Sequence, residues 1–526
     1  MKLLSVSLPL HDSSISYFDG ETVRYIKLER TKQVKRYTMT DRWSWINEIK
    51  TQWNLDVNDV DEIIFDFHPM SFYDKYKPYH PKLEQVITGE CNVVQFEDDF
   101  NIFKDVISNK NIYYTSHHYA HALSLWPLTD KLPDITFVID GEGDYRSWSV
   151  FRHHKLIAKG IIENGSIGGN YWKTANFLGI KSQNSGDSSG KLMGLQSYGE
   201  LNNHYLNVLR TMDMIEIDKI FSFDTWNQFH NNMELVPGLK ALDWIKTVHY
   251  RVGELICEHF KKYIREGDSI GYVGGVAQNI IWNSELKQRY PNIIIPPHSG
   301  DEGISLGSLE WLRMKNNLPP FKLNNYPYVQ DDFAPETEPS DDTIKLVAGY
   351  LAEGKIVGWY QGKGEIGPRA LGNRSILMDP RIPNGKQKIN NIKRREQYRP
   401  FGASVLKEHS SKYFDMTFDD DYMLFSTNVN SDSFPAITHI DGTCRVHTVT
   451  DKNPAFRKLL EEFYKLTGCG LLLNTSLNIG GKPLAGYPQV AKDLFYTVAL
   501  DHMVMGNEIY NRETDNSIFL GNERRW

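Results

Sequence analysis

A strand–turn–strand pattern that occurs twice in the sequence is the feature that most limits how this chain can fold. Residues 3–29 alternate β-rich runs with polar turns, one of them at Asp19-Gly20. Residues 135–160 repeat this plan, with an acidic, glycine-containing turn between two strands and a further hairpin behind them. Two such units predict an internal duplication within an α/β fold, in which each hairpin tip presents small residues and backbone N–H groups to an anion. Split nucleotide-binding folds hold phosphate in this way.

The length of 526 residues and a hydrophobic content of 40% allow more than one buried core. Residues 315–342 are rich in Pro, Asn and acidic residues and lack periodicity, which indicates a linker. After this stretch the sequence predicts a helix at 343–354 and a strand at 355–362. We therefore expect two domains, residues 1–330 and residues 340–526.

The overall composition disfavours several classes of protein. A formal net charge of −7 and a pI near 6.2 weigh against DNA as a partner, although a local groove could still be basic. Four cysteines lie far apart without a CxxC pair, which argues against a disulfide scaffold and favours a cytoplasmic protein. The apolar start of the chain lacks a cleavage pattern and is interpreted as a strand. No apolar run is long enough to span a membrane, so no membrane anchor is expected.

The stretch HHYAH suggests a metal site. On a helix, His117 and His121 are four residues apart and share one face, whereas His118 points elsewhere. Asp140 ends a predicted strand and Asp301 sits in the turn HSGDEG, so both carboxylates lie at strand ends beside glycine. Together these side chains would form a two-nitrogen, two-oxygen set for iron, manganese or zinc. The alternative is that the histidines line a polar groove and the aspartates only cap turns.

A glycine turn further along the chain suggests a nucleotide site. Residues 267–286 predict a strand, a Gly274-Gly275 turn and a helix, a geometry that lets a nucleotide approach the backbone where the helix begins. The Gly- and Ser-rich segment 165–199 contains Lys191 and is interpreted as a functional loop. Residues 39–110 show no isolated chemistry and are expected to be scaffold.

Basic residues gather in the second predicted domain. GKGEIGPRALGNRSILMDPR and NIKRREQYRPFG contain more basic than acidic groups around rigid Gly and Pro turns, which favours a phosphate-sized anion pocket over a solvated basic face. The basic residues are Lys363, Arg369, Arg374, Arg381, Lys393, Arg394, Arg395 and Arg399. Arg445 would extend the pocket if it faces inward. LLLNTSLN is a buried-looking strand that ends in neutral donors, which suit a phosphate or carbamoyl oxygen; a polar turn is the competing explanation.

In this order, the motifs of the chain resemble those of the NodU/CmcH family of O-carbamoyltransferases. The matching segments are HDSS, HHYAHALS, VIDGEGD, GKLMGLQSYG, GGVAQN, SGDEG, GPRALGNRSIL, KRREQYRPFG, THIDGTCRVHTV and LLLNTSLN. The resemblance implies a duplicated ASKHA-type (actin-like ATPase) N-terminal domain and a YrdC-like C-terminal domain. It further implies that the C-terminal domain converts carbamoyl phosphate and ATP, with Mg²⁺, into carbamoyl adenylate. The N-terminal domain would then move the carbamoyl group to an acceptor hydroxyl with the help of a metal, typically iron.

The resemblance also implies roles for individual residues. His117, His121, Asp140 and Asp301 would be the metal ligands, with His118 outside this set. His11 and Asp12 would face the acceptor, and one of them would accept its hydroxyl proton. The expected nucleotide contacts in the first domain are Lys191, Gly274, Gly275 and Asn279. Carbamoyl phosphate and the ATP phosphates would be bound in the second domain by Arg369, Lys393, Arg399, Arg445, Asn474 and Ser476.

Some positions depart from the family pattern and other functions compete. Lys363 stands where arginine is usual, and Leu477 replaces an aromatic residue. A sugar-kinase-like phosphotransferase would share the duplicated hairpins without needing the basic domain, and a non-catalytic nucleotide-binding protein would show no turnover. The acceptor stays open: a natural product, a sugar, or a hydroxymethylated pyrimidine in a nucleotide or in DNA.

Overall fold

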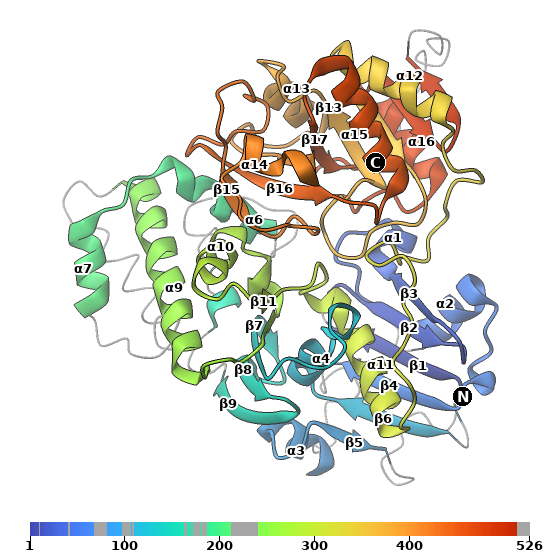
Figure 1. The fold of residues 1–526 in the computed structure, drawn as a ribbon. Helices are drawn as coiled ribbons and strands as arrows, with labels where there is room; N and C mark the ends of the chain where they lie inside the picture. The colour runs from blue at the N-terminus through green and yellow to red at the C-terminus, as the bar shows by residue number, and fades with distance from the viewer. Residues whose placement is uncertain are drawn as a thin grey trace. The chain divides into compact units, whose positions relative to one another are not determined.

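The computed structural model in Figure 1 consists of two compact units. The first comprises Met1–Lys32 and Arg36–Asn324, and the second comprises Gln33–Lys35 and Asn325–Trp526. The residues that the structure describes are 1–9, 11–39, 43–67, 81–96, 107, 110–161, 166–169, 171, 180, 187–211 and 240–512. Within these ranges no helix combines the length and apolarity needed to cross a membrane.

The first unit contains a six-stranded sheet near the N-terminus. Its strands are β1 (Leu3–Leu8), β2 (Ser14–Phe18), β3 (Val23–Lys27), β4 (Glu62–Phe67), β5 (Val93–Gln95) and β6 (Asn111–Thr115), in the order β3-β2-β1-β4-β6-β5. β1, β2 and β3 pair antiparallel, whereas β4 is parallel to both β1 and β6. The opening apolar residues therefore form the predicted first strand.

A second sheet of the same unit repeats this topology. Its strands are β7 (Ile135–Gly143), β8 (Arg146–Arg152), β9 (Lys155–Ile161), β10 (Ile270–Val273) and β11 (Ile293–Ile294), in the order β11-β10-β7-β8-β9. β7, β8 and β9 pair antiparallel, and β10 is parallel to β7 and β11. Two antiparallel hairpins followed by parallel strands thus occur in both sheets. This confirms the predicted duplicated, actin-like α/β fold.

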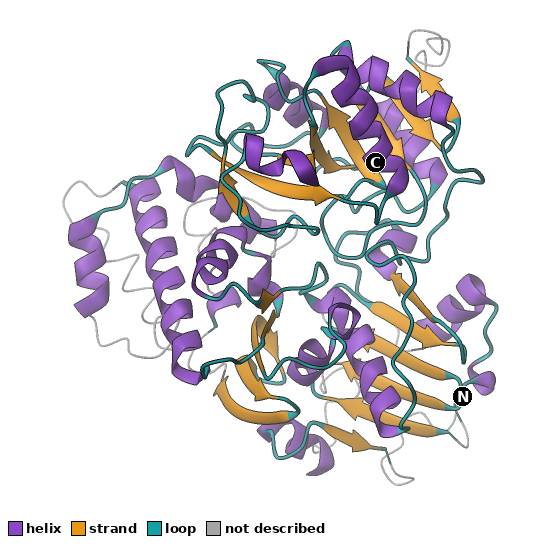
Figure 2. Cartoon of the chain, in the orientation of Figure 1, coloured by secondary structure: helices purple, strands orange, loops and turns teal. Residues whose placement is uncertain are grey.

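Helices surround the two sheets (Figure 2). They are α1 (Leu28–Lys32), α2 (Ser44–Trp53), α3 (Pro81–Thr88), α4 (His117–Leu123), α6 (Asp187–Leu195), α7 (Asn203–Thr211), α9 (Ala241–Tyr263), α10 (Ile280–Arg289) and α11 (Ile304–Lys315). α11 packs on β1, β2 and β4, α4 packs on β7, and the two helices pack against each other. Gly307 permits this close approach, because a Cβ atom there would collide with the carbonyl oxygen of Ala120.

The second unit is built on one mixed sheet of eight strands. These are β12 (Val357–Tyr360), β13 (Arg374–Met378), β14 (Gly402–Leu406), β15 (Ser426–Asn428), β16 (Thr443–Val449), β17 (Leu471–Ser476), β18 (His502–Met505) and β19 (Glu508–Asn511), in the order β15-β16-β14-β17-β13-β12-β18-β19. The helices are α12 (Asp341–Ala352), α13 (Gly385–Ile392), α14 (Ser410–Tyr413), α15 (Pro454–Thr467) and α16 (Pro488–Thr497). The predicted helix and strand after the linker are α12 and β12.

Candidate functional site

Helix α4 begins where the chain leaves β6, and its first turn is fixed by Asp144. The Asp144 carboxylate accepts hydrogen bonds from the His117 backbone N–H at 2.6 Å and from the Ser116 hydroxyl at 2.8 Å. A carboxylate is favourable here because it compensates the unpaired N–H groups of a helix N-terminus. Gly143, at the end of β7, leaves room for the His117 ring, which a Cβ atom would strike. The VIDGEGD turn therefore positions the first histidine.

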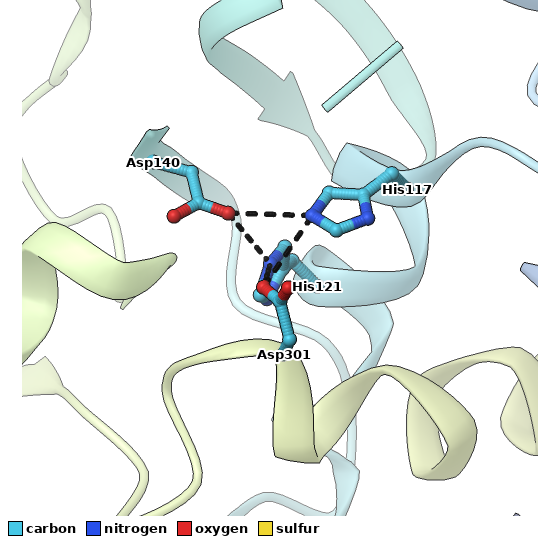
Figure 3. A group of neighbouring side chains, drawn as sticks. All are labelled: His117, His121, Asp140 and Asp301. Carbon is cyan, nitrogen blue, oxygen red and sulfur yellow. Dashed lines mark hydrogen bonds and ion pairs between the residues drawn. The ribbon is translucent and has the colours of Figure 1, made fainter. Parts of the chain in front are cut away.

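His117, His121, Asp140 and Asp301 converge in one buried group, here called the donor cluster (Figure 3). The His117 and His121 Nε2 atoms lie 3.3 and 3.2 Å from the same Asp140 oxygen, Oδ2. Asp301 Oδ1 approaches these two nitrogens at 3.6 and 3.4 Å. His118 lies outside the cluster, with Nδ1 2.9 Å from the Ser149 hydroxyl. The structure brings together the four residues that the sequence proposed as metal ligands.

The donor cluster has the chemistry of a metal site. Its two imidazole nitrogens and two carboxylate oxygens lie within 4.8 Å of one another, and this donor set suits iron, manganese or zinc. The second Asp140 oxygen accepts the N–H groups of Gly141 at 2.7 Å and Gly275 at 3.0 Å, which leaves Oδ2 for the cluster. The backbone therefore orients this carboxylate. The residues present fit a divalent transition-metal ion.

Charge within the donor cluster is strongly coupled. Burial opposes the charged imidazole of His117, but the carboxylates of Asp66, Asp301 and Asp140 raise its pKa well above the ordinary value. Burial acts against ionisation of Asp140 too, yet hydrogen bonds from His117 and His121 hold the pKa of this carboxyl well below its usual range. These carboxylates thus require nearby positive charge, which two imidazolium groups or a metal ion can supply.

Asp66 belongs to the segment 39–110, which was expected to be scaffold, and it contacts the donor cluster. Its carboxylate, at the end of β4, lies 3.4 Å from His117 Nδ1, on the side of the ring away from the other ligands. The Ser7 hydroxyl donates to the same Asp66 oxygen at 3.3 Å. The sequence did contain a signal, because Asp66 is an acidic residue within the apolar strand EIIFDF. A charge that is buried in such a strand needs a partner from elsewhere in the fold.

His11 and Asp12 lie beside the donor cluster. His11 Nδ1 is 3.0 Å from Asp12 Oδ2 and 3.3 Å from Asp301 Oδ2, and the His11 side chain remains 43% exposed. Burial opposes its protonation, but Asp301 and Asp12 raise the pKa of His11 to about 9. The other Asp12 oxygen lies 2.9 Å from the buried Lys27 Nζ, which also approaches Glu29 at 3.2 Å. The sequence reasoning missed Lys27, because it lies in an ordinary β-strand pattern.

In the structure, two of the residues predicted to bind a nucleotide in the first unit support the local backbone. Gly274, with φ of 94°, donates to the Ser299 carbonyl at 2.7 Å, and a Cβ atom there would collide with the Ile139 carbonyl oxygen. Asn279 caps α10 by accepting from Ile281 N–H at 3.1 Å, and its amide nitrogen lies 3.1 Å from His249 Nε2.

Lys191 is buried in α6. The Gly- and Ser-rich segment 165–199 that contains it lies only partly within the described residues, since 165, 170, 172–179 and 181–186 fall outside them.

In the second unit, Lys393 is tied to the turn after β17. Its buried Nζ lies 2.6 Å from the Ser476 carbonyl, 3.0 Å from the Asn478 carbonyl and 2.8 Å from the Asn478 side-chain oxygen. The Ser476 hydroxyl lies 3.1 Å from the same nitrogen. Two of the predicted binding residues, Lys393 and Ser476, are therefore in direct contact, and Lys393 fixes the backbone of this turn.

Lys393, Arg395, Arg399 and Arg445 form what we call the cationic cluster. Burial lowers the pKa of Lys393 well below its usual value, and the charges of Arg395 and Arg399 lower it further. Burial lowers the pKa of Arg445 to about 10, and Arg399 acts in the same direction. Glu396 lies 3.8 Å from Arg399. Mutual repulsion among these neighbouring cations is what an anion would relieve.

Asn474, in β17, contacts the segment that precedes β13 and contains Arg369. The fully buried amide nitrogen of Asn474 donates to the Ala370 carbonyl at 3.1 Å and lies 2.8 Å from the Ser404 hydroxyl. The Asn474 oxygen Oδ1 has no hydrogen-bond partner within the described part of the chain. Ala370 follows Arg369 directly, so Asn474 fixes the backbone next to this arginine.

The remaining basic residues of the first basic segment are paired with acids. Arg374 is fully buried, lies 3.0 Å from Asp332 and packs over the Tyr360 ring at 3.7 Å. Arg381 contacts Asp379 at 2.6 Å, and the half-exposed Lys363 contacts Asp331 at 2.9 Å. The basic excess seen in the sequence therefore divides into a paired, structural group and the cationic cluster.

Comparison with known proteins matches both parts of the chain to carbamoyltransferases. Residues 2–309 match the family model described as "Carbamoyltransferase N-terminus", and residues 348–512 match "Carbamoyltransferase C-terminus". The 3'-hydroxymethylcephem-O-carbamoyltransferase of Amycolatopsis lactamdurans is 28% identical, over 78% of this chain and 82% of that protein. Nodulation protein NolNO of Sinorhizobium fredii is 28% identical, over 97% of this chain and 81% of that protein. Among solved structures, HypF of T. kodakarensis shares 13% identity at a TM-score of 0.39, over 61% of this chain and 48% of that one.

Proposed function

Because the chain belongs to the carbamoyltransferase family, we propose that it is an ATP-dependent O-carbamoyltransferase that uses carbamoyl phosphate. The second unit would form carbamoyl adenylate from carbamoyl phosphate and ATP with Mg²⁺, releasing phosphate and pyrophosphate. The first unit would transfer the carbamoyl group to an acceptor hydroxyl and release AMP. The observation that supports this proposal most directly is the donor cluster, in which a chain matched to this family brings together four residues from three separate segments.

Activation is proposed for the cationic cluster and its neighbours. Arg399 and Arg445 would bind phosphate groups, because the geometry of a guanidinium group matches that of phosphate oxygens. Without a bound anion, the two arginines repel each other. Lys393 would hold the Ser476 turn against the same anion. Asn474 would accept a hydrogen bond from the carbamoyl NH₂ through its unpartnered oxygen. Arg369, next to the Ala370 carbonyl that Asn474 binds, would contact the phosphates of ATP.

Transfer is proposed for the first unit, with His11 as the base. His11 Nδ1–H would donate a hydrogen bond to Asp12 Oδ2, which leaves Nε2 to take the proton of the acceptor hydroxyl. His11 is the more exposed of the two, whereas Asp12 is buried and bound to Lys27. Neutralising Asp301 would return the pKa of His11 toward that of an ordinary imidazole, because Asp301 is one of the charges that raise it.

The donor cluster would hold a divalent cation, iron by resemblance to the family, with manganese and zinc as further ions that suit the ligands. Such a cation supplies Lewis-acid stabilisation of negative charge on the departing phosphate group. Asp140 and Asp301 would keep the site's charge balanced, and Gly275 would keep Asp140 turned toward it. Lys191 and the Gly274-Gly275 turn would line the nucleotide end of this site.

We propose a small molecule with a hydroxyl group as the acceptor. The A. lactamdurans relative is named for a hydroxymethyl acceptor, a primary alcohol on a small molecule. A sugar, another natural product or a hydroxymethylated pyrimidine nucleotide has the same reactive group, and DNA carrying such a base is disfavoured by the net charge of −7.

The half-reaction without acceptor tests the proposal. We would measure carbamoyl-phosphate-dependent release of pyrophosphate from ATP for the wild type, Arg399→Ala and His117→Ala. Arg399→Ala should abolish release and His117→Ala should largely retain it. Arg394→Ala is the matched control, because this exposed arginine of the same segment donates to the Thr497 carbonyl, and its substitution should be neutral. Metal-loaded wild type that releases no pyrophosphate with carbamoyl phosphate would overturn the proposal in favour of a kinase-like phosphotransferase.

A further inference from the structure

The two histidines of the donor cluster have unequal surroundings. His117 turns Nε2 toward Asp140 and Asp301, and its other nitrogen, Nδ1, lies 3.4 Å from Asp66 Oδ2. His121 also turns Nε2 toward the ligands, but its buried Nδ1 has no hydrogen-bond partner among the residues described. One ring is therefore held from both sides and the other from one side only.

The first sheet places Asp66 for this contact. Along β4, Ile63 and Phe65 point into a hydrophobic core, so Asp66, which alternates with them, points to the opposite face. There it lies level with Ser7 of β1, whose hydroxyl donates to the oxygen that faces His117. Asp66 and Ser7 are 1% and 0% exposed, so water does not solvate the carboxylate. Sheet register, and not a loop, fixes the position of this acid.

A buried carboxylate needs a functional or electrostatic partner, because removing its charge from water is costly. The partners of Asp66 in the described chain are the Ser7 hydroxyl and the His117 ring. A carboxylate behind a ligating imidazole keeps the proton on the far nitrogen, fixes the ring orientation and makes the near nitrogen a better donor. Asp66 meets this description for His117, and no described carboxylate does so for His121.

Resting on the metal role in the proposed function, we propose that Asp66 is a positioning residue that orients His117 and strengthens its bond to the cation. His117 would then be the stronger of the two histidine ligands. Asp66 itself stays outside the ligand set, since it contacts the opposite side of the ring.

The test is a Co²⁺ titration of the full chain after chelation of bound metal. Visible absorption of bound Co²⁺ and competition with a chelator give the affinity and a signature of ligand geometry. Asp66→Asn should bind Co²⁺ about 10–100-fold more weakly than the wild type, with a changed spectrum. The melting temperature of the metal-free variant should fall, because His117 loses one of its charge partners, so circular dichroism must show that the variant is folded before the titration.

Glu62→Gln is the matched control, because Glu62 lies on the same strand and the same face and is 3% exposed. Its carboxylate bonds Asn316 at 2.7 Å and contacts Lys315, away from the donor cluster. Glu62→Gln should therefore bind Co²⁺ like the wild type. Equal losses in Glu62→Gln and Asp66→Asn would attribute the effect to the sheet and overturn the proposal, as would wild-type affinity in Asp66→Asn.

Ser7→Ala provides a second approach if Asp66→Asn does not fold. It removes the hydroxyl that holds Asp66 and leaves the carboxylate in place, so we expect a smaller loss of Co²⁺ affinity, and unchanged affinity would count against the proposal. A wild-type chain that binds no Co²⁺ gives a different result: it would overturn the metal role in the proposed function, on which the role of Asp66 depends.

Discussion

The donor cluster of the first unit and the cationic cluster of the second differ in the direction in which their residues shift one another's pKa. In the donor cluster, histidines and carboxylates shift each other's pKa toward the charged forms, so the group is balanced without a ligand. In the cationic cluster, burial and neighbouring cations shift the pKa of Lys393 and Arg445 toward the neutral forms. The first cluster can exchange protons for a metal, whereas the second gains stability only when an anion enters. Substitutions in the two clusters should therefore differ in their effects on stability as well as on activity.

The largest effect is expected for His121→Ala in the donor cluster. Loss of one of the four proposed ligands should reduce carbamoylation of an acceptor by more than about 100-fold. This exceeds the loss of about 10–100-fold that is typical when a residue hydrogen-bonded to a metal ligand is replaced. The metal-free protein should also melt at a lower temperature, because Asp140 and Asp301 lose a compensating imidazole. Product formation and thermal unfolding measure the two effects. His118→Gln, which alters the neighbouring ring bound to Ser149, should retain metal binding.

Arg445→Met should give a smaller loss of activity and the opposite result for stability. Removing one guanidinium group from the cationic cluster should raise the KM for carbamoyl phosphate roughly 10–100-fold, the effect of one charge-assisted hydrogen bond. The melting temperature without ligand should stay constant or rise, because Arg445 and Arg399 repel each other. Steady-state pyrophosphate release and calorimetry measure both. A fall in melting temperature as large as that of His121→Ala would break the comparison.

The pH dependence of the stability of the second unit should show a third effect, of moderate size, at His447. Burial lowers the pKa of His447 to about 3, and Lys452 acts in the same direction. The unfolded chain therefore takes up a proton near the ordinary histidine pKa of about 6.5 that the folded chain does not, so stability is lost as pH falls below that value. His447→Gln should reduce this slope by up to about 1.4 kcal/mol per pH unit in urea unfolding between pH 7.5 and 4.5.

The smallest effect is expected for Lys363→Ala, in the paired group of basic residues. Lys363 is half exposed and forms an ion pair with Asp331, and exposed pairs of this kind contribute about 0–1 kcal/mol. Pyrophosphate release should stay within about twofold of the wild type, since no phosphate contact is lost. A large rise in the KM for carbamoyl phosphate would show that Lys363 belongs to the cationic cluster and not to the group of basic residues that are paired with acids.

The sequence predicted the duplicated fold and the donor cluster because both have local signals. The two hairpins have β-rich runs and turn residues at matching places, and HHYAH places two histidines on one helical face. Asp140 and Asp301 could be added because each follows a strand beside glycine. The four side chains meet only because α4 packs on α11, a tertiary contact that no local sequence pattern reveals. The resemblance to the family motifs was therefore needed to group these four residues.

The second unit was harder to interpret, because basic residues look alike in sequence. Arg374 and Arg399 both lie in Gly- and Pro-rich motifs, yet Arg374 is buried against Asp332 and Arg399 is partly exposed. The acidic partner of Arg374, Asp332, is distant in sequence, so only the tertiary structure distinguishes the two arginines. Asp66 and Lys27 were missed for a related reason: each is a single charge in a strand, and its function depends on a neighbour from another part of the chain.

The ligands of the donor cluster come from three segments of the duplicated fold. His117 and His121 belong to α4, Asp140 ends β7 of the second sheet, and Asp301 lies just ahead of α11, which packs on the first sheet. A metal bound to all four would cross-link both halves of the unit and close two long loops of the chain, so part of its binding energy would become resistance to opening. Hydrogen exchange in α4 and α11 should therefore slow when the metal is added, well before any substrate is present.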